Sequence, residues 1–499
     1  MAQTVPHSES QKDSLDAVRN ALKLGASLVV TLAMAFGVRL FLPRYFGPDL
    51  FGPLKFAEAY AAAFFVFLGL GLDIYIRREV AVRPEHATDF LGGILLARVF
   101  LAVLLFAGMD FLLARGGGPQ ASRALVFVFG GAQFLLVTNT SLAALLQARG
   151  KVDGLSWSNI ATKALWGGLI ALAIGMGVGT LGVATALLVS EVVKSVVLVA
   201  LVQKHLGWRL QVNWAATWAV IAASFPFYLN TVAHTVYAKV GVSFLAFLSK
   251  NAAEVGRYGA ASDLAGLTLT ITPLINWVLL PLYARARARS DDEFNATLRR
   301  SLEFILSLGI PVSLMLGLGA ELWMRVAFGA EYVAGAGALR ILAPLFALTY
   351  VAMVCATCLT NLNRAWTLTL VSVLGLLLNP LLNWVLIRLA IHSGQPDAAG
   401  AACAWADVIT EVAVTGAMLL WVGRRAFDRR SAIALCKTLG VTGGVVVLHV
   451  LLAPLGHVRL LLDAAAYSIG VLASGALRFN ESVTLVRTAL ANRHKQVPA

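Results

Sequence analysis

Apolar stretches dominate the chain. About fourteen of them, each roughly twenty residues long, follow one another with only short polar segments between. A bilayer core of about 30 Å needs roughly twenty apolar residues for each helical crossing. The pattern therefore predicts an all-α polytopic membrane protein. The predicted spans are 18–42, 52–75, 90–113, 123–147, 154–176, 181–203, 214–240, 257–283, 299–320, 335–361, 365–390, 398–422, 432–454 and 458–478.

Composition and charge agree with this interpretation and set an orientation. Hydrophobic residues make up 59% of the chain and charged residues 13%, with a net charge of +14. If both termini are cytoplasmic, the inner segments carry about three times as many Lys and Arg as the outer ones, as the positive-inside rule requires. Basic loops at a membrane face anionic lipid headgroups. We therefore expect a lipid bilayer, and no nucleic acid, as the partner of these charges.

The chain repeats itself weakly. Segment 51–58 begins with an aromatic residue and glycine and ends with an acid, and segment 258–263 does the same. Two shorter matches, 147–149 with 362–364 and 189–193 with 409–413, recur in the same order. Six spans per half is an even number, so two pseudo-symmetric bundles would share one orientation and be related by an axis along the membrane normal. The predicted organisation is a cytoplasmic tail (1–13), two six-helix bundles (14–210 and 211–430), two extra helices (431–479) and a basic cytoplasmic tail (480–499).

Several cations lie inside the predicted spans. Each would cost about 2.5–3.5 kcal/mol facing lipid at the centre of the bilayer, so most of them are expected to face the protein interior. Interhelical ion pairs and a polar cavity are both compatible with this placement. A cavity with surplus Lys and Arg suits an anionic ligand such as a pyrophosphate, which Arg grips with two hydrogen bonds. The candidate substrate-binding residues are Arg39, Arg98, Lys163 and Lys239.

Acids inside the spans are candidates for coupling or for structural pairing. Glu191 stands three residues before Lys194 on one predicted helix, so the two can neutralise each other. Asp407 and Glu411 stand four apart and share a face, where they would repel unless a cation or proton intervenes. Lys163 is a candidate for that cation.

Prolines within spans are concentrated in the second half, and Pro226 and Pro273 are the candidates for bending during gating. Cys355 and Cys358 form a C-x-x-C, but it lies inside an apolar span with no neighbouring His or Cys pair to complete a metal site, and the histidines show no metal spacing. No soluble catalytic constellation is present. We therefore predict no cofactor, no metal site and no enzymatic activity.

Three segments resemble a known family. Residues 43–52 read P-R-Y-F-G-P-D-L-F-G, residues 69–73 and 77–81 read G-L-G-L-D and R-R-E-V-A, and residues 328–343 contain F-G-A-E-Y and A-L-R-I-L-A. These segments resemble signatures of polysaccharide and O-antigen flippases, a branch of the multidrug, oligosaccharidyl-lipid and polysaccharide exporter superfamily. Pro43 replaces the usual small residue. The signatures look like helix-end and packing determinants, so the resemblance transfers no ligand-binding residue.

The resemblance implies a bacterial inner-membrane flippase for O-antigen, exopolysaccharide or capsule synthesis. It would move undecaprenyl-pyrophosphate-linked oligosaccharide from the cytoplasmic to the periplasmic leaflet by alternating access through a cationic central cavity. The two extra helices would accommodate the lipid, and a polysaccharide polymerase and other assembly proteins are candidate partners. Two alternatives remain: a cation-coupled multidrug exporter of the same superfamily, and a membrane glycan polymerase or ligase. The exporter would need an acidic cavity, and the enzymes usually carry a sizeable catalytic outer loop.

Overall fold

The fold consists of long helices. The computed structural model describes residues 7–80, 83, 86–116, 123–207, 211–267, 269, 272–362, 364–426 and 428–475. Within these ranges all regular secondary structure is helical. This confirms the predicted all-α class.

Eleven helices of the described part are long and apolar enough to cross a membrane. The first, Lys23–Gly69, covers 47 residues and joins two predicted spans, 18–42 and 52–75. Two further predicted spans, 154–176 and 257–283, are helical but are not among the eleven. The remaining ten predicted spans each overlap one of the eleven helices, and span 214–240 does so only from Tyr228 onward. The chain is a multi-pass membrane protein.

Helix α1 (His7–Phe65) bends once along its length. Gly47 has φ 70° and ψ 169°, a backbone conformation that glycine adopts far more readily than other residues. A Cβ at this position would also lie 3.2 Å from Glu331 Oε2. At about 1.5 Å per residue, a straight helix of this length would be far longer than the bilayer is thick. The bend therefore separates the helix into two crossing lengths.

Contacts divide the chain into two compact units, which are described separately. Unit 1 comprises Met1–Asp263, Ala327–Gly335 and Thr369–Asp407, and unit 2 comprises Leu264–Val326, Ala336–Leu368 and Val408–Ala499. Each unit combines three segments that are separated in the sequence. The predicted six-helix halves, 14–210 and 211–430, and their pseudo-symmetry therefore stay a prediction.

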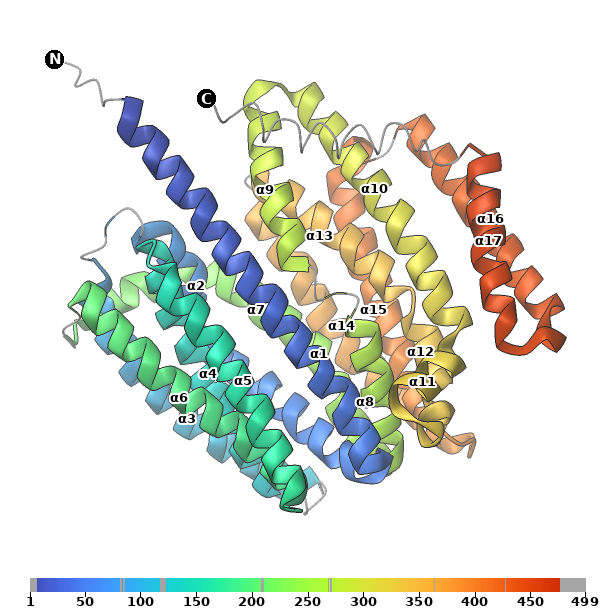
Figure 1. The fold of residues 1–499 in the computed structure, drawn as a ribbon, viewed down its shortest axis with the longest axis horizontal. Coiled ribbons are helices and arrows are strands. Elements are labelled where there is room, and N and C mark those ends of the chain that lie inside the picture. The colour runs from blue at the N-terminus through green and yellow to red at the C-terminus, as the bar shows by residue number, and fades with distance from the viewer. Residues whose placement is uncertain are drawn as a thin grey trace. The chain divides into compact units, whose positions relative to one another are not determined.

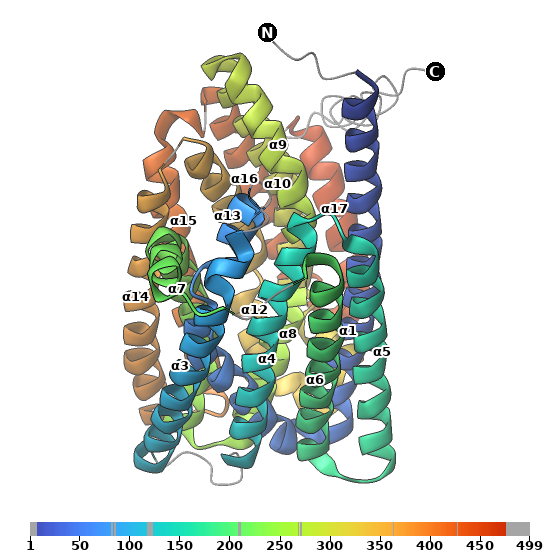
Figure 2. The ribbon, with the colours of Figure 1, turned by 90° about the vertical axis from the view of Figure 1, so that its left-hand side faces the viewer.

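Unit 1 is built around α1. Helices α4 and α5 pack along α1, and α6 packs against both of them (Figures 1 and 2). Helix α7 contacts α1, α3 and the short helix α2. The helices of this unit, some of which continue beyond it, are α1, η1 (Val66–Gly69), α2 (Leu72–Tyr75), η2 (Ile76–Val80), α3 (Ala87–Gly116), α4 (Arg123–Ala148), α5 (Val152–Gly175), α6 (Gly179–Leu206), α7 (Trp214–Ser249), α8 (Ala252–Leu267), η5 (Ala330–Gly335), α14 (Ala365–His392) and α15 (Ala398–Val422).

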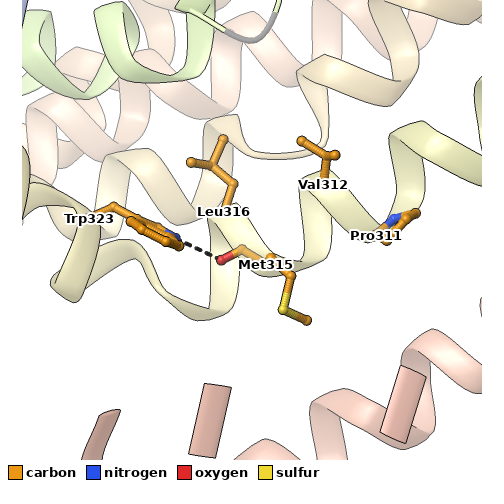
Figure 3. A pocket seen from close by; sticks show the side chains of 5 residues that line it. All are labelled: Pro311, Val312, Met315, Leu316 and Trp323. Carbon is orange, nitrogen blue, oxygen red and sulfur yellow. Dashed lines mark hydrogen bonds between the residues drawn. The ribbon is translucent and has the colours of Figure 1, made fainter. Parts of the chain in front are cut away.

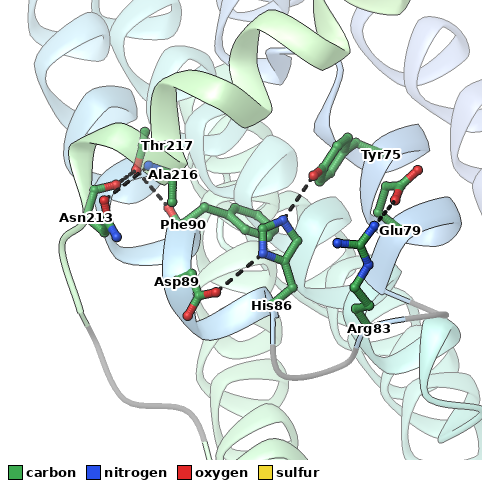
Figure 4. A network of polar contacts seen from close by, with 9 residues as sticks. All are labelled: Tyr75, Glu79, Arg83, His86, Asp89, Phe90, Asn213, Ala216 and Thr217. Carbon is green, nitrogen blue, oxygen red and sulfur yellow. Dashed lines mark hydrogen bonds and ion pairs between the residues drawn. The ribbon is translucent and has the colours of Figure 1, made fainter.

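Polar contacts fix the starts of α3 and α7 in unit 1 (Figure 4). The Tyr75 hydroxyl and His86 Nε2 lie 3.0 Å apart, and His86 Nδ1 lies 3.4 Å from Asp89 Oδ2. The Asn213 side chain caps α7, and Thr217 Oγ1 donates to the Phe90 carbonyl at 3.3 Å. The last residue of α2 is thereby tied to the start of α3, and α3 is tied to α7.

Unit 2 is organised around α10. Helix α10 packs against α9, α13, α16 and α17, and α16 packs against α17. Figure 1 shows α16 and α17 as an adjacent pair. These two helices, α16 and α17, lie in the predicted extra segment 431–479 apart from the first turn of α16. The bounds are α9 (Thr272–Arg289), α10 (Asp291–Leu318), α11 (Ala320–Phe328), α12 (Ala336–Leu342), α13 (Leu345–Asn361), η6 (Gly423–Arg425), α16 (Arg429–Leu451), η7 (Ala453–Val458) and α17 (Arg459–Ala473).

Unit 2 has two further features, a capped helix start and a small cavity. Asp428 caps α16, and hydrogen bonds from the Ser431 amide and hydroxyl lower the pKa of its carboxyl. A cavity of about 330 Å³ lies between α10 and α11, lined by Pro311, Val312, Met315, Leu316 and Trp323 (Figure 3). The residues that line it are apolar apart from the Trp323 indole, which donates to the Met315 carbonyl.

Candidate functional site

Positive side chains from several helices of unit 1 gather around Glu58. Lys55 Nζ lies 2.6 Å from Asp263 Oδ1 and 3.2 Å from Glu58 Oε2. Lys239 interacts electrostatically with both of these acids, and Lys163 interacts with Glu58. Arg39 acts on both lysines. The group is called the basic cluster and consists of Arg39, Lys55, Glu58, Lys163, Lys239 and Asp263.

The basic cluster has a positive surplus and an accessible side. Its four cations face two acids. Lys55 is buried, with only 8% of its side chain exposed, whereas Arg39 and Lys239 are exposed. Lys239 lies within a helix long enough to span the membrane, where a cation facing lipid would be costly. We therefore expect the exposed cations to face water or an anionic ligand.

The two copies of the repeated motif meet at this cluster. A Cβ on Gly52 would lie 2.0 Å from the Ala252 carbonyl oxygen, and one on Gly256 would lie 2.1 Å from the Pro48 carbonyl oxygen. One on Gly259 would lie 2.5 Å from Lys55 Cγ. Small residues let helices approach this closely within membranes. These three glycines form the glycine seam, which holds the second part of α1 against α8 and places Lys55 beside Asp263.

Lys163 joins the basic cluster from α5. Its Nζ lies 3.6 Å from the centre of the Trp166 ring, a cation–π contact. Glu191 on α6 is among its electrostatic neighbours and accepts a hydrogen bond from Asn139 Nδ2 at 2.8 Å. The Glu191–Lys163 interaction thus links the basic cluster to α6 and α4.

Arg98 does not belong to the basic cluster. It is 1% exposed, and its Nε donates to the Leu68 carbonyl at 2.8 Å. Its Nη2 donates to the Gly69 carbonyl at 3.3 Å and to Ser141 Oγ at 2.9 Å. The guanidinium is therefore engaged by the backbone at the end of η1. Three of the four predicted substrate-binding cations are brought together, and Arg98 is held elsewhere.

Asp407 lies in a polar network of its own within unit 1. The Tyr258 hydroxyl donates to Asp407 Oδ2 at 2.5 Å, and Asn379 Nδ2 donates to Oδ1 at 3.0 Å. Lys239 acts on Asp407 electrostatically. A Cβ on Gly241 would lie 3.5 Å from Asp407 Oδ1, so α7 passes close to this carboxylate. Asp407 thus interacts with Lys239, which is also a member of the basic cluster.

Glu411 has other surroundings. It belongs to unit 2, where Thr349 Oγ1 donates to its Oε1 at 2.9 Å, whereas Asp407 belongs to unit 1. Thr349 lies on α13, whereas Tyr258 and Asn379, which bind Asp407, lie on α8 and α14. Lys163, the cation expected between them, lies among Arg39, Glu191 and Lys194. The coupling roles of Glu191, Asp407 and Glu411 stay predictions.

The gating prolines occupy two kinds of position. Pro226 lies inside α7, and Pro273 is the second residue of α9, where proline is well tolerated. Their side chains lie outside the described part of the structure. Their role in bending stays a prediction.

Sequence reasoning missed part of the site. Lys55, Glu58 and Asp263 look like boundary residues whose charges reach the membrane surface, yet they form the centre of the basic cluster. The repeated motif was the usable signal, because both copies carry the residues that meet. The signal for Tyr258 and Asn379 is weaker: each is a polar side chain in an otherwise apolar span.

The sequence has recognisable relatives. A model of the family described as "Polysaccharide biosynthesis protein" matches residues 17–287. A protein of Escherichia coli (strain K12) described as "Putative O-antigen transporter" is 22% identical over 335 residues, which cover 64% of this chain and 79% of the relative. These matches confirm the resemblance inferred from the three motif segments.

Solved structures share the fold. The lipid II flippase MurJ in an inward closed conformation gives a TM-score of 0.69 at 12% identity, covering 93% of this chain and all of that one (100%). A multidrug resistance MATE transporter of the MOP superfamily, inward-facing, gives 0.62 at 15% identity, covering 80% of this chain and 98% of that one. The relatives named here are transporters and flippases, which confirms the expectation of a transport protein that is not an enzyme.

Proposed function

This chain belongs to the polysaccharide biosynthesis protein family, and from that premise we propose that it is a lipid-linked oligosaccharide flippase. Its substrate would be an undecaprenyl-pyrophosphate-linked glycan, moved from the cytoplasmic to the periplasmic leaflet of a bacterial inner membrane. The observation that carries the proposal is the basic cluster. Two exposed cations, Arg39 and Lys239, stand beside buried charges that position them.

The chemistry of a diphosphate fits this cluster. Arg binds phosphate oxygens in a fixed fork geometry, and Lys binds them as a point charge. The two acids of the cluster keep the site from being fully cationic, so an anion can be released as well as bound. The sugars would share the polar surroundings, while the polyprenyl tail stays in the bilayer.

A substitution experiment tests this role. The double variant Arg39→Ala/Lys239→Ala should reduce export of lipid-linked glycan by about tenfold or more, since each lost charged hydrogen bond weakens binding by about 1.5–3 kcal/mol. The charge-matched control is Lys204→Gln/Arg388→Gln, which removes two exposed cations outside the basic cluster. Both proteins are compared at equal membrane abundance in a strain that depends on this chain for surface glycan.

The alternatives give different results in the same strains. A multidrug exporter would change the accumulation of cationic drugs and leave glycan export intact. A polymerase or ligase would change glycan chain length or attachment while precursor still reached the outer leaflet. Full export by the Arg39/Lys239 variant would remove the basic cluster from the mechanism.

A further inference from the structure

The end of η1 in unit 1 is a break in a membrane helix. After Val66–Gly69, Leu70 has φ 51° and Gly71 has φ 69°, and a new helix, α2, begins at Leu72. A left-handed conformation is uncommon for leucine and persists only where the surroundings impose it. A Cβ on Gly71 would lie 2.6 Å from the Ser224 carbonyl oxygen, so α7 presses against the break.

A helix break exposes carbonyl oxygens that need a partner. The last carbonyl groups of a helix have no intrahelical donor, and they lie at the negative end of the helix dipole. In discontinuous membrane helices, such carbonyl groups often coordinate a sodium ion or a proton carrier. Here the Leu68 and Gly69 carbonyl oxygens accept from Arg98 at 2.8 Å and 3.3 Å.

The remaining contacts of Arg98 also resemble those of a bound ion. Ser141 Oγ accepts from Arg98 Nη2 at 2.9 Å and donates to Asp73 Oδ1 at 3.0 Å. Asp73 acts on Arg98 electrostatically. The second terminal nitrogen, Nη1, is buried and has no hydrogen-bond acceptor among the described residues. The guanidinium therefore places a positive charge among several oxygen atoms, although one of its terminal nitrogens has no acceptor there. A metal ion would likewise supply charge to these oxygen atoms without directional donors.

We propose that Arg98 is a resident cation, a side chain that takes the place of an exchangeable alkali-metal ion at this helix break. It holds the η1–α2 junction with a charge that cannot dissociate. The break therefore keeps its geometry whatever the ion gradient, and any ion exchanged during transport is exchanged elsewhere. Arg98 is a positioning residue in this view, and its hydrogen-bond partners in the described part of the chain lie outside the basic cluster.

The variant Arg98→Ala, in which the side chain is shortened, should be stabilised by alkali-metal ions more than the wild type is. Arg98→Ala removes the guanidinium and leaves two carbonyl oxygens and a hydroxyl around the vacated space, with the Asp73 carboxylate hydrogen-bonded to that hydroxyl. Oxygen atoms of these kinds are the ligands that hard cations prefer. Purified Arg98→Ala should unfold at a lower temperature than the wild type. Replacing choline chloride by NaCl or KCl should then raise its unfolding midpoint by about 2–4 °C more than it raises that of the wild type.

A second substitution identifies the ligands. In Arg98→Ala/Ser141→Ala and in Arg98→Ala/Asp73→Asn, the additional ion-dependent shift should disappear, because each removes one oxygen ligand or its charge. A merely structural loss of packing would be unaffected by the choice of cation. An ion response equal to that of the wild type in Arg98→Ala would overturn the proposal.

A conservative pair decides the question if Arg98→Ala does not fold. Arg98→Lys keeps a positive charge, and Arg98→Gln keeps hydrogen-bond donors without the charge. A resident cation requires that the Lys variant remain folded, with no additional ion response, and that the Gln variant be markedly less stable. Equal stability of the two variants would show that hydrogen bonding, and not charge, holds the break.

Discussion

Lys55 is a buried cation whose position depends on its neighbours. Its stem packs over Gly259, and its Nζ reaches Asp263 and Glu58. A buried ion pair need not add stability relative to apolar side chains, but removal of one partner leaves an uncompensated charge. Lys55 is therefore expected to matter mainly because its removal would take the ion-pair partner from Asp263.

Lys55→Met should lower the free energy of unfolding by about 3 kcal/mol, because Asp263 and Glu58 would lose the ammonium group that contacts them at 2.6 Å and 3.2 Å. The measurement is denaturant unfolding of the purified protein in detergent, with the exposed-lysine variant Lys204→Met as the control. Adding Asp263→Asn to Lys55→Met should restore part of the loss. A double variant that loses the sum of the two single effects would contradict the pairing.

At the scale of elements, the close contact of α1 with α8 explains why both copies of the repeated motif contain glycine. Gly52, in the first copy, faces the Ala252 carbonyl oxygen, which cannot turn aside as a side chain can, and Gly259, in the second copy, faces Lys55 Cγ. Any larger residue must push the helices apart, and the Lys55–Asp263 distance would grow with that movement. Packing and electrostatics are thus coupled in one pair of helices.

Gly52→Ala should therefore destabilise the protein by about 1–3 kcal/mol through overpacking. The matched control lies on the same helix: Gly37 has no atom within 4 Å of its Cβ position, so Gly37→Ala should be neutral or stabilising by up to about 1 kcal/mol. Thermal unfolding of the two variants side by side gives the comparison. Equal midpoints for the two would mean that the glycine seam can relax.

At the scale of the whole molecule, the distribution of Lys and Arg predicts that both termini are cytoplasmic. Green fluorescent protein fused to the C-terminus should fluoresce, since it matures only on the cytoplasmic side. Alkaline phosphatase inserted between α3 and α4 should be active, because that connection is predicted to be external. Active phosphatase at the C-terminus would reverse the orientation and, with it, the proposed direction of transport.

The sequence was most informative about the membrane spans and least informative about contacts between distant helices. Apolar runs predicted the helices, since span length depends only on local composition. The division of span 257–283 into α8 and α9 was missed, although Pro273 favours a helix start. Arg98 was predicted to bind substrate because its charge is visible in the sequence. Its carbonyl partners come from a distant helix end, and no local pattern reveals them.

Gly47 has a consequence for the basic cluster. Arg39 precedes this residue and Lys55 follows it on the same continuous helix, α1. A small rotation at that one joint would change the position of the exposed Arg39 guanidinium relative to the Lys55–Asp263 pair and to Lys239 beside it, while each arm of the helix stayed rigid. The grip on an anion would then tighten or loosen with the angle of a single backbone hinge.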